Sequence, residues 1–274
     1  MAGQASRAAV LGSPVAHSRS PLLHLAAYRE LGLTDWTYER IECTAEQLPG
    51  LVSGLGPEWV GLSVTMPGKV AALEFATERT ERAVLAASAN TLVRTESGWR
   101  ADCTDVDGVV GALAGAPDLR NGSAVVIGAG GTARPALLAL LELGAAEVTI
   151  VARDAGRASA TLELAARLGM RGRVVDFAHT PVAAAVAAAR VVVSTVPAAA
   201  AAPIAEAAAG APFLLDAIYD PWPTPLADAV TKSGGTVVSG LTMLLNQAYG
   251  QVEQFTGRPA PRAVMAAALH AGHL

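Results

Sequence analysis

Only two lysines occur in this sequence, and arginine carries the rest of its positive charge. Lys69 follows an apolar run at residues 60–64 and begins a stretch with helical periodicity. An ammonium can release its proton when it is desolvated, whereas a guanidinium cannot. Lys69 is therefore a candidate for proton transfer. A solvent-exposed lysine beside a helix start explains the same residue equally well.

Two further polar clusters follow apolar runs, at the strand ends where open α/β sheets present ligands. Ser18 and Ser20 lie two residues apart at a helix start and could hold a carboxylate together with backbone N–H groups. Asn90 and segment 102–108, which contains Asp105, supply an amide and three carboxylates, and we expect them to face a cleft between two domains. The alternatives are ordinary: Ser20 would cap the helix, and the acidic residues would be caps or turns.

A glycine-rich segment is typical of a dinucleotide site. It follows the apolar run 124–127 and opens the helical stretch 133–143 with Gly128, Ala129, Gly130, Gly131, Thr132 and Ala133. The first glycine permits the tight turn, the second lets the backbone approach a pyrophosphate, and the alanine lets the helix pack on the sheet. An ordinary strand-to-helix turn is the alternative, but the five further strand candidates after it favour dinucleotide binding.

The end of the next apolar run, at residue 151, is where the ribose of a dinucleotide would lie. Arg153 and Arg157 could hold a 2′-phosphate, whereas an acidic residue such as Asp154 favours the free 2′-hydroxyl. We therefore expect NADP in preference to NAD. The alternative is that Asp154 caps a helix and both arginines are solvated.

Short apolar runs alternate with helical stretches over the whole chain, which predicts an α/β fold with largely parallel sheets. In the first part, strands are expected at 7–11, 38–41, 60–64 and 91–94, with helices at 21–31, 45–55, 69–76 and 81–87. After a loop at 117–122, six strands are expected at 124–127, 147–151, 173–175, 191–194, 213–216 and 236–238, enough for a complete doubly wound sheet. Two helices, 241–255 and 262–270, follow without a further strand.

Composition excludes several classes. The 274 residues are 52% hydrophobic, carry a net charge of −4 and show no basic run, so disorder and a nucleic-acid partner are not expected. The two cysteines, Cys43 and Cys103, form no metal or disulfide spacing, which makes a reducing cytoplasm the default. We expect no metal, no membrane segment and no signal sequence. The oligomeric state stays open, with a homodimer as one candidate.

Six motifs, taken in their order, resemble the shikimate dehydrogenase family closely along nearly the whole chain. They lie at residues 12–21, 63–69, 87–91, 103–108, 128–132 and 240–248. The resemblance implies an N-terminal open α/β substrate domain, 1–107 with 240–274, and a doubly wound Rossmann domain, 108–239, that binds NADP. It implies reversible NADPH-dependent reduction of 3-dehydroshikimate to shikimate, a step of aromatic amino-acid biosynthesis.

The resemblance also implies a role for individual residues. Lys69 and Asp105 would be the catalytic pair, with Asp105 orienting Lys69 or acting as the base in the oxidation direction. Ser18 and Ser20 would bind the substrate carboxylate with help from Tyr219. The ring hydroxyls would be surrounded by Thr65, Lys69, Asn90, Asp105 and Gln247. On the cofactor side, Thr195 would lie along the dinucleotide, with Ala217 and Gly240 near the nicotinamide, in addition to the glycine-rich segment, Arg153 and Arg157.

Two positions depart from the family pattern, since Ser63 and Cys103 stand where the family has asparagine. Either change removes an amide that could hydrogen-bond substrate or hold a loop. The rival interpretations are a quinate or aminoshikimate dehydrogenase of the same fold, and a dinucleotide-binding protein without catalytic activity. Lys69 and Asp105 speak against the second.

Overall fold

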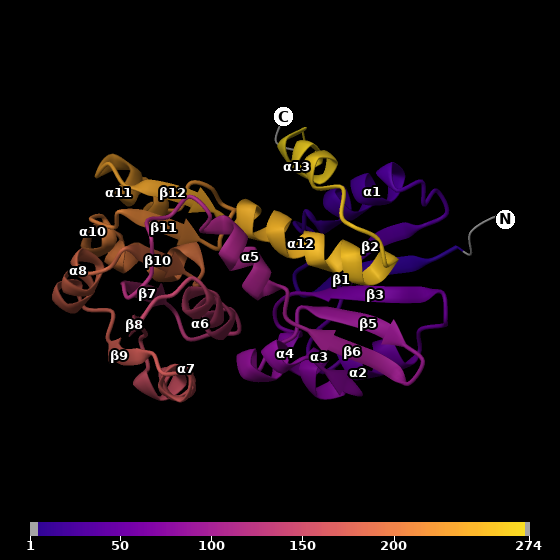
Figure 1. Ribbon diagram of the computed structural model, residues 1–274, viewed down its shortest axis with the longest axis horizontal. Helices are drawn as coiled ribbons and strands as arrows, with labels where there is room; N and C mark the ends of the chain where they lie inside the picture. Colours follow the sequence, from indigo (N-terminus) through magenta and orange to yellow (C-terminus); the bar gives the residue numbers. More distant parts are fainter. Residues whose placement is uncertain (1–4, 272–274) are drawn as a thin grey trace. The chain divides into compact units, whose positions relative to one another are not determined.

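The computed structural model describes residues 5–271, which form two compact units (Figure 1). The first contains the described residues up to Asp105 and those from Leu244 onward, and the second runs from Val106 to Met243. Each unit is built around one six-stranded sheet, as expected for an α/β protein. Within the described residues, no helix is both long and apolar enough to cross a membrane.

The sheet of the first unit is mixed rather than parallel. Its strands lie in the order β2-β1-β3-β5-β6-β4, with β1 parallel to β2 and β3, and β5 antiparallel to both β3 and β6. The bounds are β1 Arg7–Gly12, β2 Thr37–Glu42, β3 Trp59–Val64, β4 Glu78–Arg79, β5 Thr91–Thr95 and β6 Gly98–Asp102. Five of the six strands run in the same direction, as expected for a largely parallel sheet; β5 alone is reversed, because only two residues join it to β6 and such a short turn can link only antiparallel strands.

Helices that precede and follow the β5–β6 hairpin in the sequence belong to this unit. They are α1 Ser20–Glu30, α2 Leu48–Ser53, α3 Lys69–Phe75, α4 Glu81–Ala86, α12 Gly240–Thr256 and α13 Arg262–Ala271, of which α12 belongs to this unit from Leu244 onward. The helix α13 packs on α1. Gly61 of β3 admits the ring of Phe255, since a Cβ at Gly61 would lie 2.1 Å from that ring. The helix α12 therefore lies very close to the sheet at this point.

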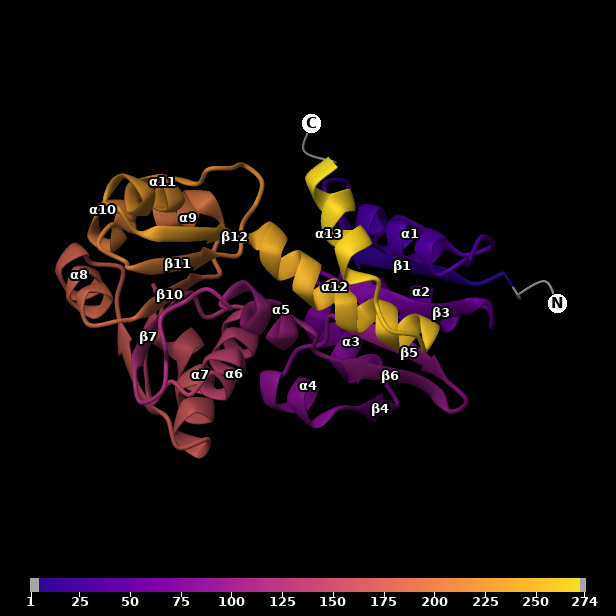
Figure 2. The same cartoon turned by 45° about the horizontal axis from the view of Figure 1, so that its top comes forward.

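The second unit has six parallel strands in the order β12-β11-β10-β7-β8-β9, which is the doubly wound arrangement (Figure 2). The strands are β7 Ser123–Ile127, β8 Glu147–Val151, β9 Arg171–Val175, β10 Val191–Ser194, β11 Phe213–Asp216 and β12 Thr236–Ser239. All six predicted strands are present. The central strands β7 and β10 are mostly apolar because both of their faces are covered, whereas the edge strand β9 carries two exposed arginines.

Small side chains fill the interior of the second unit. Its helices are α5 Asp105–Ala112, which starts at the last residue of the first unit, α6 Ala133–Glu142, α7 Ala155–Arg167, α8 His179–Ala187, α9 Ala198–Ala201, η1 Ala202–Ile204, α10 Ala205–Ala208 and α11 Pro225–Lys232. Alanines of α8 to α10 pack with Val125, Ile127 and Leu214. The small side chains let the helices pack close to the sheet, so this core is filled with few aromatic rings.

Candidate active site

Lys69 and Asp105 form an ion pair in the first unit. Lys69 is the first residue of α3, and Asp105 follows the loop after β6. Lys69 Nζ lies 2.5 Å from Asp105 Oδ2, and the two side chains are 15% and 1% exposed. Lys69 is therefore not the solvated lysine of the alternative interpretation. Two residues that lie 36 positions apart in the sequence are placed so that an ammonium and a carboxylate share a hydrogen bond.

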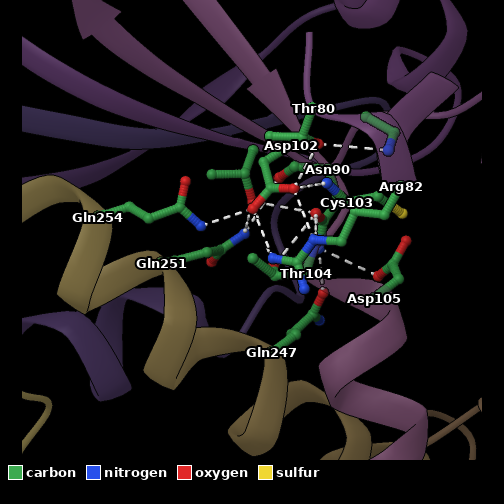
Figure 3. A network of polar contacts seen from close by, with 12 residues as sticks. Thr80, Arg82, Asn90, Asp102, Cys103, Thr104, Asp105, Gln247, Gln251 and Gln254 are labelled. Atoms are coloured by element: carbon green, nitrogen blue, oxygen red, sulfur yellow. Dashed lines mark hydrogen bonds and ion pairs between the residues drawn. The ribbon is translucent and has the colours of Figure 1, made fainter. Parts of the chain in front are cut away.

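Asn90 connects this pair to the helix α12. Its Nδ2 donates to Asp105 Oδ1 at 3.1 Å and to Gln247 Oε1 at 2.6 Å, and its Oδ1 accepts the backbone N–H of Thr104 at 2.7 Å. Figure 3 shows Gln247 extending from α12 toward this cluster. Four of the predicted substrate residues, Lys69, Asn90, Asp105 and Gln247, are thus joined by direct hydrogen bonds.

Thr65 lies at the end of β3, on the same turn that leads to Lys69. Its backbone N–H donates to the carbonyl of Leu11, and its own carbonyl accepts from Gly68. A Cβ at Gly12 would lie 2.3 Å from the Thr65 methyl group, so the ends of β1 and β3 come together only because residue 12 is glycine. This close approach places the loop after β1 beside Thr65.

The loop after β1 carries the two predicted carboxylate-binding serines. Ser18 Oγ accepts from the backbone N–H of Ser20 at 3.3 Å, and Arg40 donates to the Ser18 carbonyl through Nε at 2.9 Å and Nη2 at 2.7 Å. The alternative that Ser20 caps α1 is wrong: the helix begins at Ser20 itself, and Arg19 precedes it without a side-chain cap among the described residues. Ser20 is buried, and Ser18 holds the turn.

Both departures from the family pattern have side chains in the interior. Ser63 Oγ accepts from the hydroxyl of Tyr38 at 2.7 Å and donates to Gln251 Oε1 at 2.8 Å, so it belongs to a buried hydrogen-bond network. Cys103 is fully buried, and burial raises the pKa of its thiol well above the usual range. Neither residue supplies the amide that the family's asparagine would bring. The Ser63 hydroxyl is bonded to Tyr38 and Gln251, and Cys103 is buried.

Asp102 holds the loop that leads to Asp105, a role that its residue type alone did not predict. Arg82 forms two hydrogen bonds to its carboxylate, through Nε at 2.7 Å and Nη2 at 2.5 Å. The remaining donors, visible in Figure 3, are the Thr80 hydroxyl, the Cys103 backbone N–H and Gln254 Nε2. Burial alone would raise the pKa of Asp102, but the Arg82 guanidinium and the other donors outweigh it and lower that pKa to about 2.

In the second unit, the glycine-rich segment forms the turn between β7 and α6. Gly128 has a φ of +114°, and a Cβ there would lie 2.5 Å from Thr195 Oγ1, so only glycine fits. A Cβ at Gly130 or Gly131 would meet open space, while Ala133, the first residue of α6, is buried. The loop thus offers an uncovered backbone at the start of a helix, which suits a diphosphate.

The end of β8 carries the charged residues predicted to lie at a ribose. Asp154 caps α7 by accepting the backbone N–H of Gly156 at 2.8 Å, as in the alternative interpretation. Arg157 Nε lies 4.0 Å from Asp154 Oδ2, and the Arg157 side chain is 81% exposed. Arg153 is exposed as well. The cap and the two accessible guanidinium groups therefore coexist, so these residues fit a phosphate group.

Ala217 and Gly240 lie side by side, although 23 positions separate them. The Ala217 backbone N–H donates to the Ser194 carbonyl, and a Cβ at Gly240 would lie 2.1 Å from the Ala217 carbonyl oxygen. Thr195 Oγ1 donates to the Ile127 carbonyl at 3.0 Å, which ties it to the start of the glycine-rich turn. Tyr219 follows on the loop after β11 and is half-buried.

A doubly wound sheet with a glycine turn after its first strand and arginine after its second defines the class of dinucleotide-binding oxidoreductases, here with a buried lysine and aspartate pair in a separate unit. Residues 10–92 match the shikimate dehydrogenase substrate binding domain, and residues 240–270 match the shikimate 5'-dehydrogenase C-terminal domain. The shikimate dehydrogenase (NADP(+)) of Microcystis aeruginosa is 30% identical over 97% of both chains. The chain belongs to the shikimate dehydrogenase family.

Solved structures agree with this assignment. The shikimate dehydrogenase of Mycobacterium tuberculosis has a TM-score of 0.92 and 62% identity, covering 97% of this chain and 99% of the other. Shikimate 5-dehydrogenase of Thermus thermophilus, solved in complex with NADP(H) and shikimate, has a TM-score of 0.80 and 30% identity over 97% and 99%. The prediction of the family and of its two-part α/β fold is confirmed.

Proposed function

We propose that this protein catalyses the reversible, NADP-linked reduction of 3-dehydroshikimate to shikimate. The observation that carries the proposal is the pair of a partly buried Lys69 and a buried Asp105, hydrogen-bonded to Asn90 and through it to Gln247. Its family supports the substrate, since relatives over nearly the full length are named shikimate dehydrogenase (NADP(+)). The unit with this pair would bind the substrate, and the unit with the glycine-rich turn would bind NADP, with the division near residues 107 and 240.

In the proposed reaction, Lys69 transfers the proton to the substrate. Bound NADPH supplies the hydride that adds to the ketone carbon of the substrate. As negative charge grows on the ketone oxygen, Lys69 Nζ donates a proton to it, which leaves the neutral amine and the new hydroxyl. Asp105, whose Oδ2 lies 2.5 Å from Nζ, holds the ammonium in place beforehand and stabilises its charge. In the oxidation direction the neutral Lys69 amine takes this proton back, and Asp105 stabilises the ammonium that forms.

Several other side chains would orient the substrate. Ser18 and Ser20, fixed at the start of α1, would hold its carboxylate, with Tyr219 as a further partner. Thr65, Asn90 and Gln247 would contact its ring hydroxyls. Because Asn90 and Asp105 are almost completely buried, water competes little for these positions, and each hydrogen bond to substrate is correspondingly stronger.

The cofactor would be bound by backbone and by exposed charge. Residues 128–133 would receive the diphosphate, Thr195, Ala217 and Gly240 would line the path to the nicotinamide, and Arg153 with Arg157 would hold the 2′-phosphate. The two exposed guanidinium groups support NADP over NAD, although the Asp154 carboxylate reduces the local positive charge. We place the enzyme in the shikimate pathway of aromatic amino-acid biosynthesis and in the cytoplasm, and a homodimer is the assembly to test by light scattering.

The absorbance of the reduced nicotinamide tests this proposal directly. Purified protein is mixed with shikimate or quinate and with NADP or NAD, and the initial rates of the four combinations are compared. We expect the highest kcat/KM with shikimate and NADP. A preference for quinate would assign the rival activity, and nucleotide binding without hydride transfer from either acid would contradict an enzymatic function.

A further inference from the structure

Two backbone groups determine which side-chain atoms donate and which accept in the hydrogen bonds around Asn90. The backbone N–H of Thr104 can only donate, so the side-chain atom of Asn90 that receives it at 2.7 Å must be the oxygen. The backbone carbonyl of Asn90 can only accept, so the atom of Gln251 that faces it at 3.1 Å must be the amide nitrogen. The orientation of both side-chain amides follows from these two contacts.

Every further hydrogen bond of the network agrees with these orientations. Gln251 Oε1 can only accept, so Ser63 donates to it and must in turn accept from Tyr38. His24 Nε2, 3.3 Å from the same oxygen, must carry the ring proton. Burial lowers the pKa of His24 to about 3, so this ring is neutral and has only that one proton to donate.

Thr91 transmits this direction to Asn90. Gln251 Nε2 donates to Thr91 Oγ1 at 3.1 Å, so the Thr91 hydroxyl is left to donate, and Asn90 Oδ1 at 3.0 Å is the nearer of its two acceptors. Asn90 Oδ1 is thereby held facing the Thr91 hydroxyl and the Thr104 backbone N–H. Its Nδ2 faces Asp105, Gln247 and the Thr104 hydroxyl.

We infer that Gln251 and Thr91 are positioning residues of the proposed reaction, because together with the Thr104 backbone N–H they hold the Asn90 side-chain amide with its N–H groups facing Asp105. This inference rests on the proposed function and adds two residues to it. An amide turned by 180° would place its oxygen against the Asp105 carboxylate, which also receives Lys69. Both residues act through Asn90: Thr91 Oγ1 donates to Asn90 Oδ1, and Gln251 Nε2 donates to the Asn90 carbonyl and to Thr91 Oγ1.

The test is a pair of substitutions, one of which removes the hydroxyl while the other retains it. Thr91→Val keeps the shape of the side chain and removes the donor to Asn90, whereas Thr91→Ser keeps the donor. With Thr91→Val, we expect KM for shikimate to rise about five- to tenfold, the loss of one hydrogen bond, and KM for NADP to stay within about twofold. Thr91→Ser should restore the parental KM. Equal kinetic constants for Thr91→Val and the parent would overturn the inference.

A matched control separates positioning from a general loss of stability. Thr149 in β8 is also a buried threonine, 8% exposed, whose hydroxyl has a side-chain partner, Arg173 Nε at 2.9 Å, and it lies in the other unit. Thr149→Val should lower the free energy of unfolding by a similar amount and leave KM for shikimate unchanged. If Thr149→Val raises that KM as much as Thr91→Val does, the effect is not one of positioning and the inference is wrong.

A double-mutant cycle shows whether Thr91 acts through Asn90. In an Asn90→Ala background, the amide to be oriented is absent, so Thr91→Val should change KM by less than about twofold. The same five- to tenfold change in both backgrounds would contradict the inference.

One further measurement does not depend on the substrate. The backbone amide of Thr104, which donates to Asn90 Oδ1, should exchange its hydrogen with solvent about five- to tenfold faster in Thr91→Val than in Thr149→Val. Unchanged exchange would overturn the inference even if the enzyme turned over shikimate. Conversely, a parent protein that does not oxidise shikimate would contradict the proposed function, and the exchange rates would still decide the orientation of Asn90.

Discussion

Each unit buries one carboxylate at the carboxyl end of a strand, and the two carboxylates are treated in opposite ways. Asp102, the last residue of β6, receives a guanidinium and three further donors, and its pKa falls to about 2. Asp216, the last residue of β11, is 1% exposed, and burial raises its pKa although the Thr224 hydroxyl and the Ile218 backbone N–H donate to it. A buried carboxylate therefore stays charged at little cost only where a cation accompanies it.

The same difference separates the two candidate binding regions. In the first unit the functional groups are buried side chains in a continuous hydrogen-bond network, with Asn90, Thr91 and Asp105 at most 1% exposed. In the second unit they are an uncovered backbone turn and exposed arginines. We expect substitutions in the first region to change turnover and stability, and substitutions in the second to change cofactor affinity.

The largest expected effect is on turnover and tests whether chemistry belongs to the first unit. Lys69→Ala removes the proposed proton donor and should lower kcat by about 10²- to 10⁴-fold, the usual contribution of a positioned acid. Lys232→Ala removes the other lysine, which pairs with Asp228 on the surface of α11, and should leave kcat unchanged. Steady-state rates with shikimate and NADP check both, and parental turnover by Lys69→Ala would remove this residue from the mechanism.

Acid should destabilise the first unit through His24. Burial lowers the pKa of His24 to about 3. As pH falls below about 6.5, the His24 ring therefore becomes protonated in the unfolded chain while it stays neutral in the folded chain. Stability is therefore lost between pH 6.5 and 3, by about 2 to 3 kcal/mol from pH 6.5 to 4.5. His24→Phe keeps a ring against Tyr38, whose centroid lies 4.0 Å away, and should flatten this decline.

Urea unfolding followed by tryptophan fluorescence measures this change, because Trp36, Trp59 and Trp99 all lie in the first unit. The parent and His24→Phe are compared at pH 6.5, 5.5 and 4.5. The same pH dependence in both proteins would show that another group causes the acid sensitivity.

The two buried carboxylates offer a matched pair of substitutions. Asp102→Asn should lower the free energy of unfolding by about 2 kcal/mol at pH 7, since a pKa lowered from about 3.9 to about 2 stabilises the fold by that amount. The difference should vanish as pH falls from about 4 through 2, where the parent also loses the charge. Asp216→Asn should cost about 1 kcal/mol or less, because it removes a charge that burial already disfavours. Equal losses in thermal or urea unfolding would break the comparison.

The smallest expected effect concerns the cofactor region of the second unit. Arg153→Ala should raise KM for NADP about tenfold and leave KM for NAD unchanged, because a 2′-phosphate loses one charge-assisted hydrogen bond at an exposed site. Asp154→Asn retains a capping side chain and removes a negative charge, so KM for NADP should fall about twofold. Initial rates at varied NADP and NAD check both variants, and an equal rise of KM for both cofactors would mean that Arg153 does not contact the 2′-phosphate.

The sequence predicted the parallel sheet of the second unit well and the mixed sheet of the first unit only in part. Strands buried on both faces, such as β7, are continuous apolar runs and are easily recognised. The strand β6 contains Trp99 and Arg100 among small and acidic residues, and β4 has only two residues, both exposed. Neither carries a local signal, because pairing with neighbouring strands is what makes these segments extended.

For the candidate site, residue type predicted the groups that would do chemistry but not the groups that hold them. Lys69 was singled out by composition, and the glycine turn by its context. Gln251 and Gln254 contact Thr91 and Asp102 over separations of 160 and 152 positions, which no local pattern encodes. One signal was present: Gln247, Gln251 and Gln254 are spaced so that they share a face of the helix α12.

The helix α12 also determines when the first unit can be finished during synthesis. Its three glutamines supply hydrogen bonds to Asn90, Thr91 and Asp102, and its Phe255 ring covers Gly61. On the ribosome, residues 106–243 emerge before these groups do. The first unit therefore cannot form these hydrogen bonds until the entire second sheet has been synthesised. The part of the chain that is translated first is the last to reach its final structure.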